Sequence, residues 1–450
     1  MPEARPATDA RNLLADLITA AKRTGADEAD AVLVDAASLS YGCRLGVTEK
    51  LERAESTDLG LRVFVGRRQA IVSSTDRSPA MLKELVERAV AMAKAAPEDP
   101  YCGLADPAEI ARAVPELDLA DPAEPGPAAL EERARATEDA ARAVAGITNS
   151  EGAEAGWGKS QVTLVASNGF SGGYASTHHG VGVAVIAGSG TGMERDYDYS
   201  SAVYAADLED AQVIGRRAGE QAVKRLNPSK PATAKMPVVM HPRVARSLVS
   251  HLAAALNGEA VARGTSFLKD SMGKRILPEG VFLVDDPLRR RGHASRPFDG
   301  EGLPAGRREM VADGVLAAWF LDLRSARQLG LKPSGQAARG VSSPPSPAAS
   351  NLHLAPGKLG PRALMADIGD GLYVTELVGF GVNYVTGDYS RGATGFRIVK
   401  GELAGPVSEI TIAGNLRDMF LALTLADDLE FRYASNAPTL RLDGLTVAGT

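Results

Sequence analysis

One segment of this chain places a histidine where hydrolytic enzymes place a metal ligand. It reads His251-Leu252-Ala253-Ala254-Ala255-Leu256 and has the composition of a helix. A zinc-peptidase helix needs a His, a neighbouring Glu that deprotonates the bound water, and a second His about one turn later. Here Leu252 takes the place of the Glu, and Leu256 takes the place of the later ligand. We therefore predict neither metal ligands nor catalytic residues in this chain.

The remaining histidines and the cysteines do not complete the ligand set that a zinc ion would need. No His is followed by Glu, and none has another His four or five residues away; the other five are His178, His179, His241, His293 and His353. Neighbours in a strand point to opposite faces, so the adjacent pair cannot share an ion. The two cysteines, Cys43 and Cys102, are too few for a structural zinc site. Their scarcity is typical of a reducing compartment.

Three residues are candidate nucleophiles. Ser171 lies in Gly169-Phe170-Ser171-Gly172-Gly173, which matches the letters of a hydrolase elbow. That elbow must lead from a strand into a helix, whereas a strand-like stretch follows here, so a hairpin turn is the better interpretation. Cys43 has Arg44 beside it, but a lone strand cysteine is more often part of the core. Ser266 has no identifiable base.

Composition limits the class of protein. The chain has 450 residues, which favours two domains, and a net charge of −6, which argues against a nucleic-acid-binding surface. No apolar run approaches the ~18 residues of a membrane span. The N-terminal residues 1–5 are polar and carry no apolar signal stretch. We expect a cytoplasmic protein with no membrane and no nucleic-acid partner.

The apolar patterns predict an α+β fold. We expect an N-terminal α+β domain, residues 1–230, with an antiparallel sheet and flanking helices, and a C-terminal β-rich domain, residues 231–450, with few helices. A helix of period 3.6 covers Leu13 to Ala21, and Ser78-Pro79 begins another. Further helices are expected over 128–144, 207–226, 243–256 and 416–425. Short strands are expected at 30–35, 59–65, 69–74, 162–166, 173–178, 181–186, 236–240, 281–285, 309–313, 315–322, 372–378, 395–399 and 409–413.

Two segments are candidates for ligand binding. Residues 330–361 have the composition of a long loop, and such loops are either functional or disordered. Residues 379–396 interleave five glycines with polar and aromatic side chains. Backbone groups at a sheet edge can pair with an extended peptide, although a tight multi-turn connection explains the block equally well. The candidate peptide-binding residues are Asn383, Tyr384, Thr386, Asp388, Arg391 and, from the long loop, His353.

The same block resembles a known family. Gly381-Val382-Asn383-Tyr384-Val385-Thr386-Gly387-Asp388-Tyr389-Ser390-Arg391-Gly392-Ala393 and Ile410-Thr411-Ile412-Ala413-Gly414-Asn415-Leu416-Arg417-Asp418-Met419-Phe420 are similar to the C-terminal signature of the TldD/PmbA family. Further similarity lies in residues 263–268, 347–352 and 60–63, so it extends over nearly the whole chain. TldD-like members are zinc peptidases with a His-Glu-x-x-x-His helix and a Cys ligand near the C-terminus. This chain has no Cys after Cys102 and resembles the PmbA (TldE) branch, which lacks that set.

The resemblance implies a function shared between two subunits. It implies an intracellular two-component metallopeptidase that processes or degrades small unfolded peptides, among them a peptide-antibiotic precursor and an antitoxin. A TldD-like partner, in a heterodimer or larger assembly, would bring the zinc, and this chain would be inert alone while helping to hold extended peptides. In isolation a homodimer is expected. One alternative is a homo-oligomeric peptide-binding or gyrase-modulating protein without protease activity; another is an independent Ser, Thr or Cys hydrolase.

Overall fold

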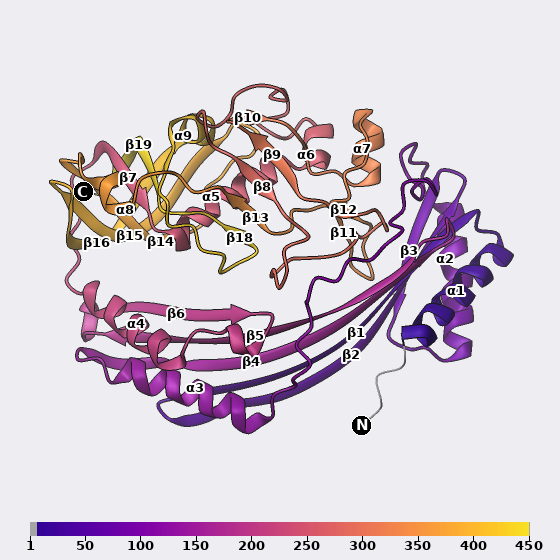
Figure 1. Cartoon of the computed structure of the whole chain (residues 1–450), viewed down its shortest axis with the longest axis horizontal. Coiled ribbons are helices and arrows are strands. Elements are labelled where there is room, and N and C mark those ends of the chain that lie inside the picture. The colour runs from indigo at the N-terminus through magenta and orange to yellow at the C-terminus, as the bar shows by residue number, and fades with distance from the viewer. Residues whose placement is uncertain (1–6, 450) are drawn as a thin grey trace.

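Six long strands of the first half form one curved antiparallel sheet (Figure 1). The computed structural model describes residues 7–449, so the polar residues 1–5 lie outside the described part. Along the sheet the order is β3-β2-β1-β4-β5-β6. The strands are β1 (Glu28–Arg44), β2 (Val47–Val65), β3 (Arg68–Ser74), β4 (Ile147–Ala166), β5 (Ser171–Ala187) and β6 (Glu194–Ala202).

These strands are longer than the sequence pattern predicts. The expected strand at 30–35 is the start of the 17-residue β1, whose middle is made of Ala and Ser and so gives little hydrophobic contrast. The two strands expected at 173–178 and 181–186 are one strand, β5. Gly180 interrupts the apolar alternation there, but pairing with β4 on one side and β6 on the other keeps the backbone extended. The hairpins at Gly66 and at Ser167-Asn168-Gly169 are confirmed.

Four helices cover one face of this sheet. Alternate residues of β1, such as Leu33 and Leu39, are buried on the same face. Leu33 belongs to the apolar cluster that contains residues of the first two helices, and Leu39 belongs to the cluster that contains residues of the other two. Each fully buried leucine contributes about 1.5–3 kcal/mol. The helices are α1 (Ala7–Thr24), α2 (Pro79–Ala95), α3 (Pro127–Arg142) and α4 (Ala211–Lys224), as predicted from their periodicity.

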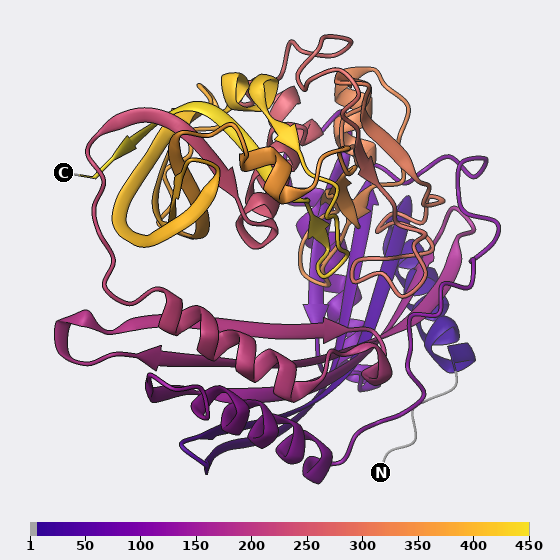
Figure 2. The same cartoon turned by 60° about the vertical axis from the view of Figure 1, so that its left-hand side comes forward.

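The second half of the chain lies over the other, concave face of the sheet (Figures 1 and 2). Phe298 and Leu303 pack there against Val32 and Leu164. A buried ionic cluster also joins the halves, because Arg339 lies 2.7 Å from Asp30, which in turn accepts hydrogen bonds from Arg62. Burying ions without partners is costly, so an arrangement of the halves that separated this cluster would be destabilised.

The second half is built around a small closed barrel. Strand β7 (Ala234–Met240) pairs with β14 (Asp370–Val378) and β19 (Leu440–Ala448), and β15 (Asp388–Val399) and β16 (Glu402–Asn415) complete the ring through a β16–β19 pairing. A short β17 (Thr424–Leu425) extends it. Helix α5 (Pro242–Ala255) buries Val244, Leu248 and Leu252 in the core that it shares with the barrel strands.

The remaining elements of the second half are short. A five-stranded sheet has the order β10-β9-β8-β13-β18. Segment 330–361, expected to be one long loop, contains three short strands and many buried side chains. The bounds are β8 (Leu283–Asp285), β9 (Arg308–Ala312), β10 (Val315–Leu316), β11 (Ala337–Ala338), β12 (Ser346–Pro347), β13 (Leu352–Leu354), β18 (Ser435–Asn436), α6 (Gly258–Ala262), α7 (Leu323–Leu329), α8 (Pro361–Met365) and α9 (Leu416–Ala422). In the first half, 3-10 turns lie at Gly190–Gly192 and Ala205–Asp207.

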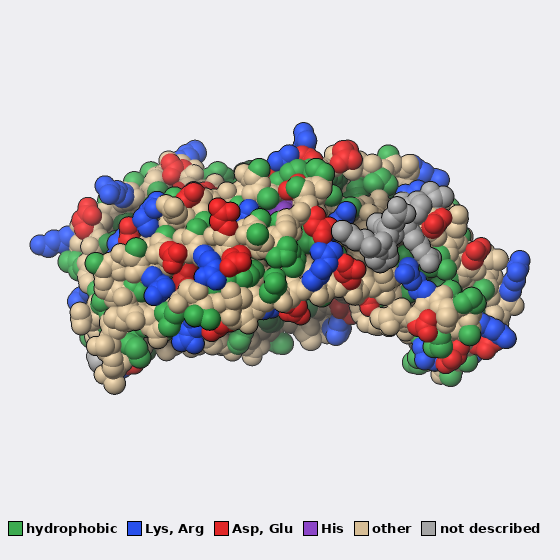
Figure 3. Space-filling model, turned by 90° about the horizontal axis from the view of Figure 1, so that it is seen from below, with side chains coloured by type: hydrophobic (Ala, Val, Ile, Leu, Met, Phe, Trp, Pro, Cys, Tyr) green, Lys and Arg blue, Asp and Glu red, His purple; other side chains and the backbone are tan. Residues whose placement is uncertain are grey.

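The architecture confirms the predicted α+β fold class, with an antiparallel sheet and helices first and a strand-rich region with few helices after it. The division into domains 1–230 and 231–450 stays a prediction. Between residues 7 and 449, no helix has both the length and the apolar character needed to cross a bilayer. On the face seen in Figure 3, basic and acidic side chains are interspersed over the coloured surface.

Candidate functional site: the His251 helix and the 379–391 segment

Helix α5 carries His251, but its side chains at the two positions where a zinc peptidase has a Glu and a second His point into the core. His241 begins the helix by accepting a hydrogen bond at Nδ1 from the Arg243 backbone N–H, at 3.0 Å. One turn from the far end, Leu252 is 1% exposed, and Leu256, which ends the helix, is fully buried. Both belong to the apolar core of the second half. The positions that would bear a Glu and a second His therefore stabilise the core instead.

The side chain of His251 has a tyrosine for its partner. Its Nδ1 lies 2.8 Å from the Tyr384 hydroxyl, and its ring centroid lies 5.9 Å from that of Tyr389. Its Nε2 is buried and makes no hydrogen bond within residues 7–449. Burial, with a smaller contribution from the charge of Arg391, lowers the pKa of His251 to about 4. The imidazole is therefore neutral at physiological pH and has a cation rather than a carboxylate nearby.

These residues do not fit a hydrolytic zinc ion. A catalytic zinc site needs three protein ligands, usually His, Cys or carboxylates. In the described part of the chain, no three such side chains lie close enough together to hold a metal ion. Around His251 the neighbouring side chains are instead Tyr384, Tyr389 and the cationic Arg391.

Three of the predicted peptide-binding residues hold the shape of the segment between β14 and β15. Asn383 accepts hydrogen bonds from the backbone N–H groups of Val385 and Thr386, at 2.9 and 3.3 Å. The Thr386 hydroxyl donates to Asp388 at 2.6 Å, and this bond, with one from Asn415, lowers the pKa of Asp388. Asn383, Thr386 and Asp388 therefore already have partners within the segment.

The exposed side chains of the segment are mostly aromatic or apolar. Phe380 is fully exposed, and Val385 and Tyr384 are also at the surface. The Arg391 guanidinium lies 5.7 Å from the centre of the Phe380 ring. The Tyr384 carbonyl accepts a hydrogen bond from the Phe267 backbone N–H at 2.7 Å, which fixes the segment against the core. We call Phe380, Tyr384, Val385 and Arg391 the hairpin surface.

The sequence left two interpretations of residues 379–396 open, a sheet edge and a tight connection, and for residues 388–396 the sheet edge is wrong. Residues 388–399 are strand β15, which pairs with β14 on one side and β16 on the other. Beyond the end of β14, the Gly381 carbonyl continues the pairing by accepting a hydrogen bond from the Ser390 backbone N–H at 2.6 Å. The backbone of β15 is therefore occupied on both sides because the barrel closes around it. An added peptide strand cannot pair there.

His353 lies apart from the other five predicted residues. It is in β13, where its ring packs edge-on against Phe431 with centroids 4.9 Å apart. Its Nδ1 is buried without a hydrogen-bond partner in the described structure, and burial lowers the pKa of the imidazole. The structure thus brings Asn383, Tyr384, Thr386, Asp388 and Arg391 together, and leaves His353 out.

The surroundings of the three candidate nucleophiles are those of structural residues and not of catalytic ones. Ser171 begins β5 after a hairpin turn, so no helix follows it. The hydroxyl of Ser266 is buried and donates to the Ala255 carbonyl at 2.6 Å. Burial and the nearby Glu138 carboxylate raise the pKa of the Cys43 thiol, which disfavours the reactive thiolate.

Sequence reasoning missed one cavity of the structure. It has a volume of about 750 Å³ and lies between the two halves, against the start of α5. Its walls come from β6, α4, the barrel strands and residues 428–439, so its residues are scattered over the sequence. No local sequence pattern marks this cavity, because its walls come from segments that are far apart in the chain.

Comparison with known proteins identifies the family. Models of PmbA/TldA metallopeptidase domain 1, central domain and C-terminal domain match residues 29–93, 120–226 and 233–449. A metalloprotease PmbA from Escherichia coli O157:H7 is 38% identical over 94% of this chain and 92% of its own length. This chain belongs to the PmbA/TldD metallopeptidase family. A more distant relative, a metalloprotease TldD homolog from Buchnera aphidicola, is 23% identical over 43% of this chain and 44% of its own.

Two solved structures share the whole fold. A proposed modulator of DNA gyrase from Bacteroides thetaiotaomicron superimposes with a TM-score of 0.90 at 27% identity, covering 98% of this chain and 99% of that chain. TldE from Thermococcus kodakarensis superimposes with a TM-score of 0.86 at 20% identity, covering 97% of this chain and 100% of that chain. The second likeness bears on the fold alone.

Proposed function

We propose that this chain is the PmbA/TldE-like subunit of a two-component zinc metallopeptidase that processes or degrades small unfolded peptides. The observation that carries the proposal is the His251 environment. Its imidazole binds Tyr384, and the neighbouring metal-set positions are core leucines. Because peptide hydrolysis at a metal needs an open ion with three protein ligands, the zinc belongs in a TldD-like partner. This chain is then inert alone and cytoplasmic with its partner.

The hairpin surface gives this subunit its part in the reaction. An exposed Phe380, with Val385 and Tyr384 beside it, is an apolar area that a partner or an extended peptide can cover. Arg391 adds a cation for a peptide carbonyl or carboxylate. Holding a substrate in register lowers the entropy cost of the chemical step, and two subunits can share that task. Asn383, Thr386 and Asp388 serve by holding the surface in shape.

Reconstitution tests this proposal. The chain purified alone should contain no stoichiometric zinc and should not cleave an unstructured fluorogenic peptide. Adding a TldD-type protein should produce cleavage that a chelator abolishes. Zinc-dependent cleavage by the isolated chain, or a complex whose activity does not need this chain, overturns the proposal.

Two substitutions locate the substrate contact. Tyr384→Ala and Arg391→Ala should each lower peptide cleavage by the complex about tenfold, because each removes a side chain of the hairpin surface, while the chain remains folded. Arg397→Ala is the matched control, since Arg397 is an exposed arginine of the same strand that pairs with Asp370. Equal losses in all three variants would point to a structural effect on β15.

A second function is a homo-oligomeric peptide-binding or regulatory protein without protease activity. The likeness to the Bacteroides thetaiotaomicron protein, a proposed modulator of DNA gyrase, favours it. This function predicts a peptide affinity that a TldD-type protein does not change and a homo-oligomer that such a protein does not dissociate. Size-exclusion chromatography with light scattering, with and without the TldD-type protein, separates the two functions.

A further inference from the structure

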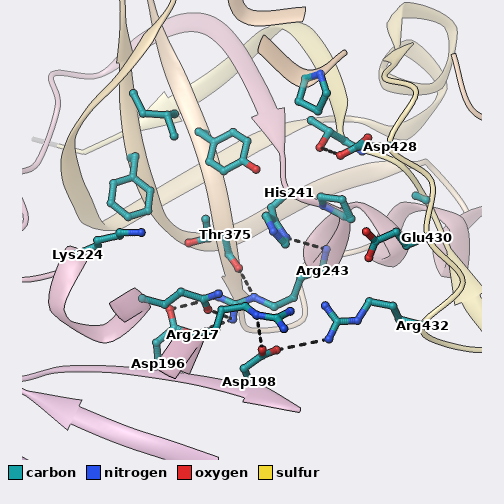
Figure 4. A pocket seen from close by; sticks show the side chains of 18 of the residues that line it. Asp196, Asp198, Arg217, Lys224, His241, Arg243, Thr375, Asp428, Glu430 and Arg432 are labelled. Carbon is teal, nitrogen blue, oxygen red and sulfur yellow. Dashed lines mark hydrogen bonds and ion pairs between the residues drawn. The ribbon is translucent and has the colours of Figure 1, made fainter. Parts of the chain in front are cut away.

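The cavity between the halves has a floor of paired charges (Figure 4). On this floor Asp198 of β6 lies 3.1 Å from Arg217 of α4. From the other half, Arg243 donates to Asp196 at 2.7 Å, and Arg432 donates to the Tyr199 carbonyl at 3.0 Å. Arg432 also lies 2.5 Å from the Glu209 carboxylate, so each of these arginines has a carboxylate partner and the floor offers little net charge to a ligand.

Unpaired charges lie at opposite ends of the cavity. In Figure 4, Lys224 lies on one side, Asp428 and Glu430 lie on the other, and Thr375 and His241 lie between them. Within residues 7–449, neither Lys224 nor Glu430 is in an ion pair. Asp428 accepts the backbone N–H and the hydroxyl of Thr439, at 2.8 and 2.7 Å, which holds its carboxylate at that end. The cavity is therefore basic at one end and acidic at the other.

The wall between the two ends is largely apolar and carries a neutral hydrogen-bond donor. Tyr373, Phe396 and Pro242 line it. His241 accepts the Arg243 N–H at Nδ1, so its hydrogen is on Nε2. Burial, and to a lesser extent the charge of Arg243, lowers the pKa of His241 to about 4, so the ring stays neutral near pH 7. Such a wall suits a ligand with an apolar middle and a carbonyl to accept one hydrogen bond.

We propose that this cavity binds a short peptide with free termini, its amine at the Asp428 and Glu430 end and its carboxylate at the Lys224 end. The volume of about 750 Å³ falls in the range of small-ligand pockets. A zwitterion with an apolar centre matches the charged ends and the aromatic wall. Peptides of this kind are released by peptide hydrolysis. The site lies apart from the hairpin surface, and it does not depend on the function proposed above.

Calorimetric titration of the full chain tests this site. The probes are the tripeptide Ala-Phe-Ala, its N-acetylated form and its C-terminal amide. The free tripeptide should bind at one site, and each capped form should bind about two- to fivefold more weakly, the effect of losing one partly exposed ion pair. The difference should shrink at 1 M salt, where screening is strong. No saturable binding, or equal binding of all three peptides, overturns the proposal.

Charge-removing variants assign each terminus to one end. Lys224→Met should abolish the discrimination against the amide and leave that against the acetylated peptide unchanged. Glu430→Gln should abolish the discrimination against the acetylated peptide and leave that against the amide unchanged. Lys332→Met, a change of an exposed lysine outside the cavity, should leave all three affinities unchanged. If Lys224→Met alters recognition of the amino terminus instead, or if the control variant has the same effect, the proposed orientation is wrong.

Discussion

The hydroxyl of Tyr384 lies 2.8 Å from Nδ1 of His251, although the two residues are 133 positions apart in the chain. Helix α5 leaves the barrel after β7, and the segment after β14 returns across it. Because β14 pairs with β7 in parallel, the ends of both strands reach the same side of the barrel. This places a tyrosine against the one histidine of the helix.

Rebuilding the zinc motif should destabilise the protein. Leu252→Glu removes a buried leucine and buries a carboxylate without a partner, which should lower the free energy of unfolding by about 4 kcal/mol. The double variant Leu252→Glu with Leu256→His should bind no stoichiometric zinc while folded. Chemical denaturation and metal analysis measure both effects. Ser250→Glu, on the exposed face of the same helix, should change stability by less than about 0.5 kcal/mol. A stable double variant that holds zinc would contradict this expectation.

Stability should fall as the pH drops from 6.5 to 4. Burial holds the pKa of both His251 and His241 at about 4, below the ordinary value of 6.5. Within that window the unfolded chain takes up protons that the folded chain excludes, so acid favours unfolding. Each histidine should account for a loss of about 2 kcal/mol, after allowance for partial exposure. Urea unfolding at pH 7.5 and pH 5 should show a shallower decline for His251→Gln, and an unchanged decline would contradict the prediction.

Phe380→Asp should weaken association with a TldD-type partner. The ring is fully exposed in the isolated chain, so its loss should not affect folding, whereas aromatic side chains at the centre of an interface often carry much of the binding energy. We expect an affinity loss of about thirtyfold or more, measured by surface plasmon resonance. Met193→Asp, at another exposed apolar position in the first half, is the control. Equal binding of the Phe380 variant would place the interface elsewhere.

Gly395→Ala should destabilise the barrel. A β-carbon there would overlap the Tyr373 carbonyl of the neighbouring strand β14, so the two strands would have to separate. We expect a loss of about 3 kcal/mol in thermal or chemical unfolding. At Gly405, on β16, a β-carbon would meet nothing within 4 Å, so Gly405→Ala should leave stability close to that of the unchanged chain. Equal stabilities would mean that the barrel adapts to the extra atom.

Much of the fold could be predicted from local pattern. Helices α2 and α5 begin at Ser78-Pro79 and His241-Pro242, where a polar residue followed by Pro marks a helix start. Strand lengths were less accessible, because β1 and β5 pass through polar and glycine-containing stretches whose extended form depends on neighbouring strands. The mistaken sheet edge at β15 has the same cause, since barrel closure is a long-range property.

For the candidate site too, some features follow from the residue types and others only from the tertiary structure. The residue types at positions 252 and 256 by themselves determined that the helix lacks a zinc set, because no packing can turn leucine into a ligand. Family motifs likewise directed attention to residues 381–393. Only the tertiary structure decided that Tyr384 meets His251, that His353 stands apart, and that Lys224 and Glu430 share a cavity. The chemistry of a side chain is fixed by its residue type, whereas contacts between distant segments depend on how the barrel, the sheet and the helices pack together.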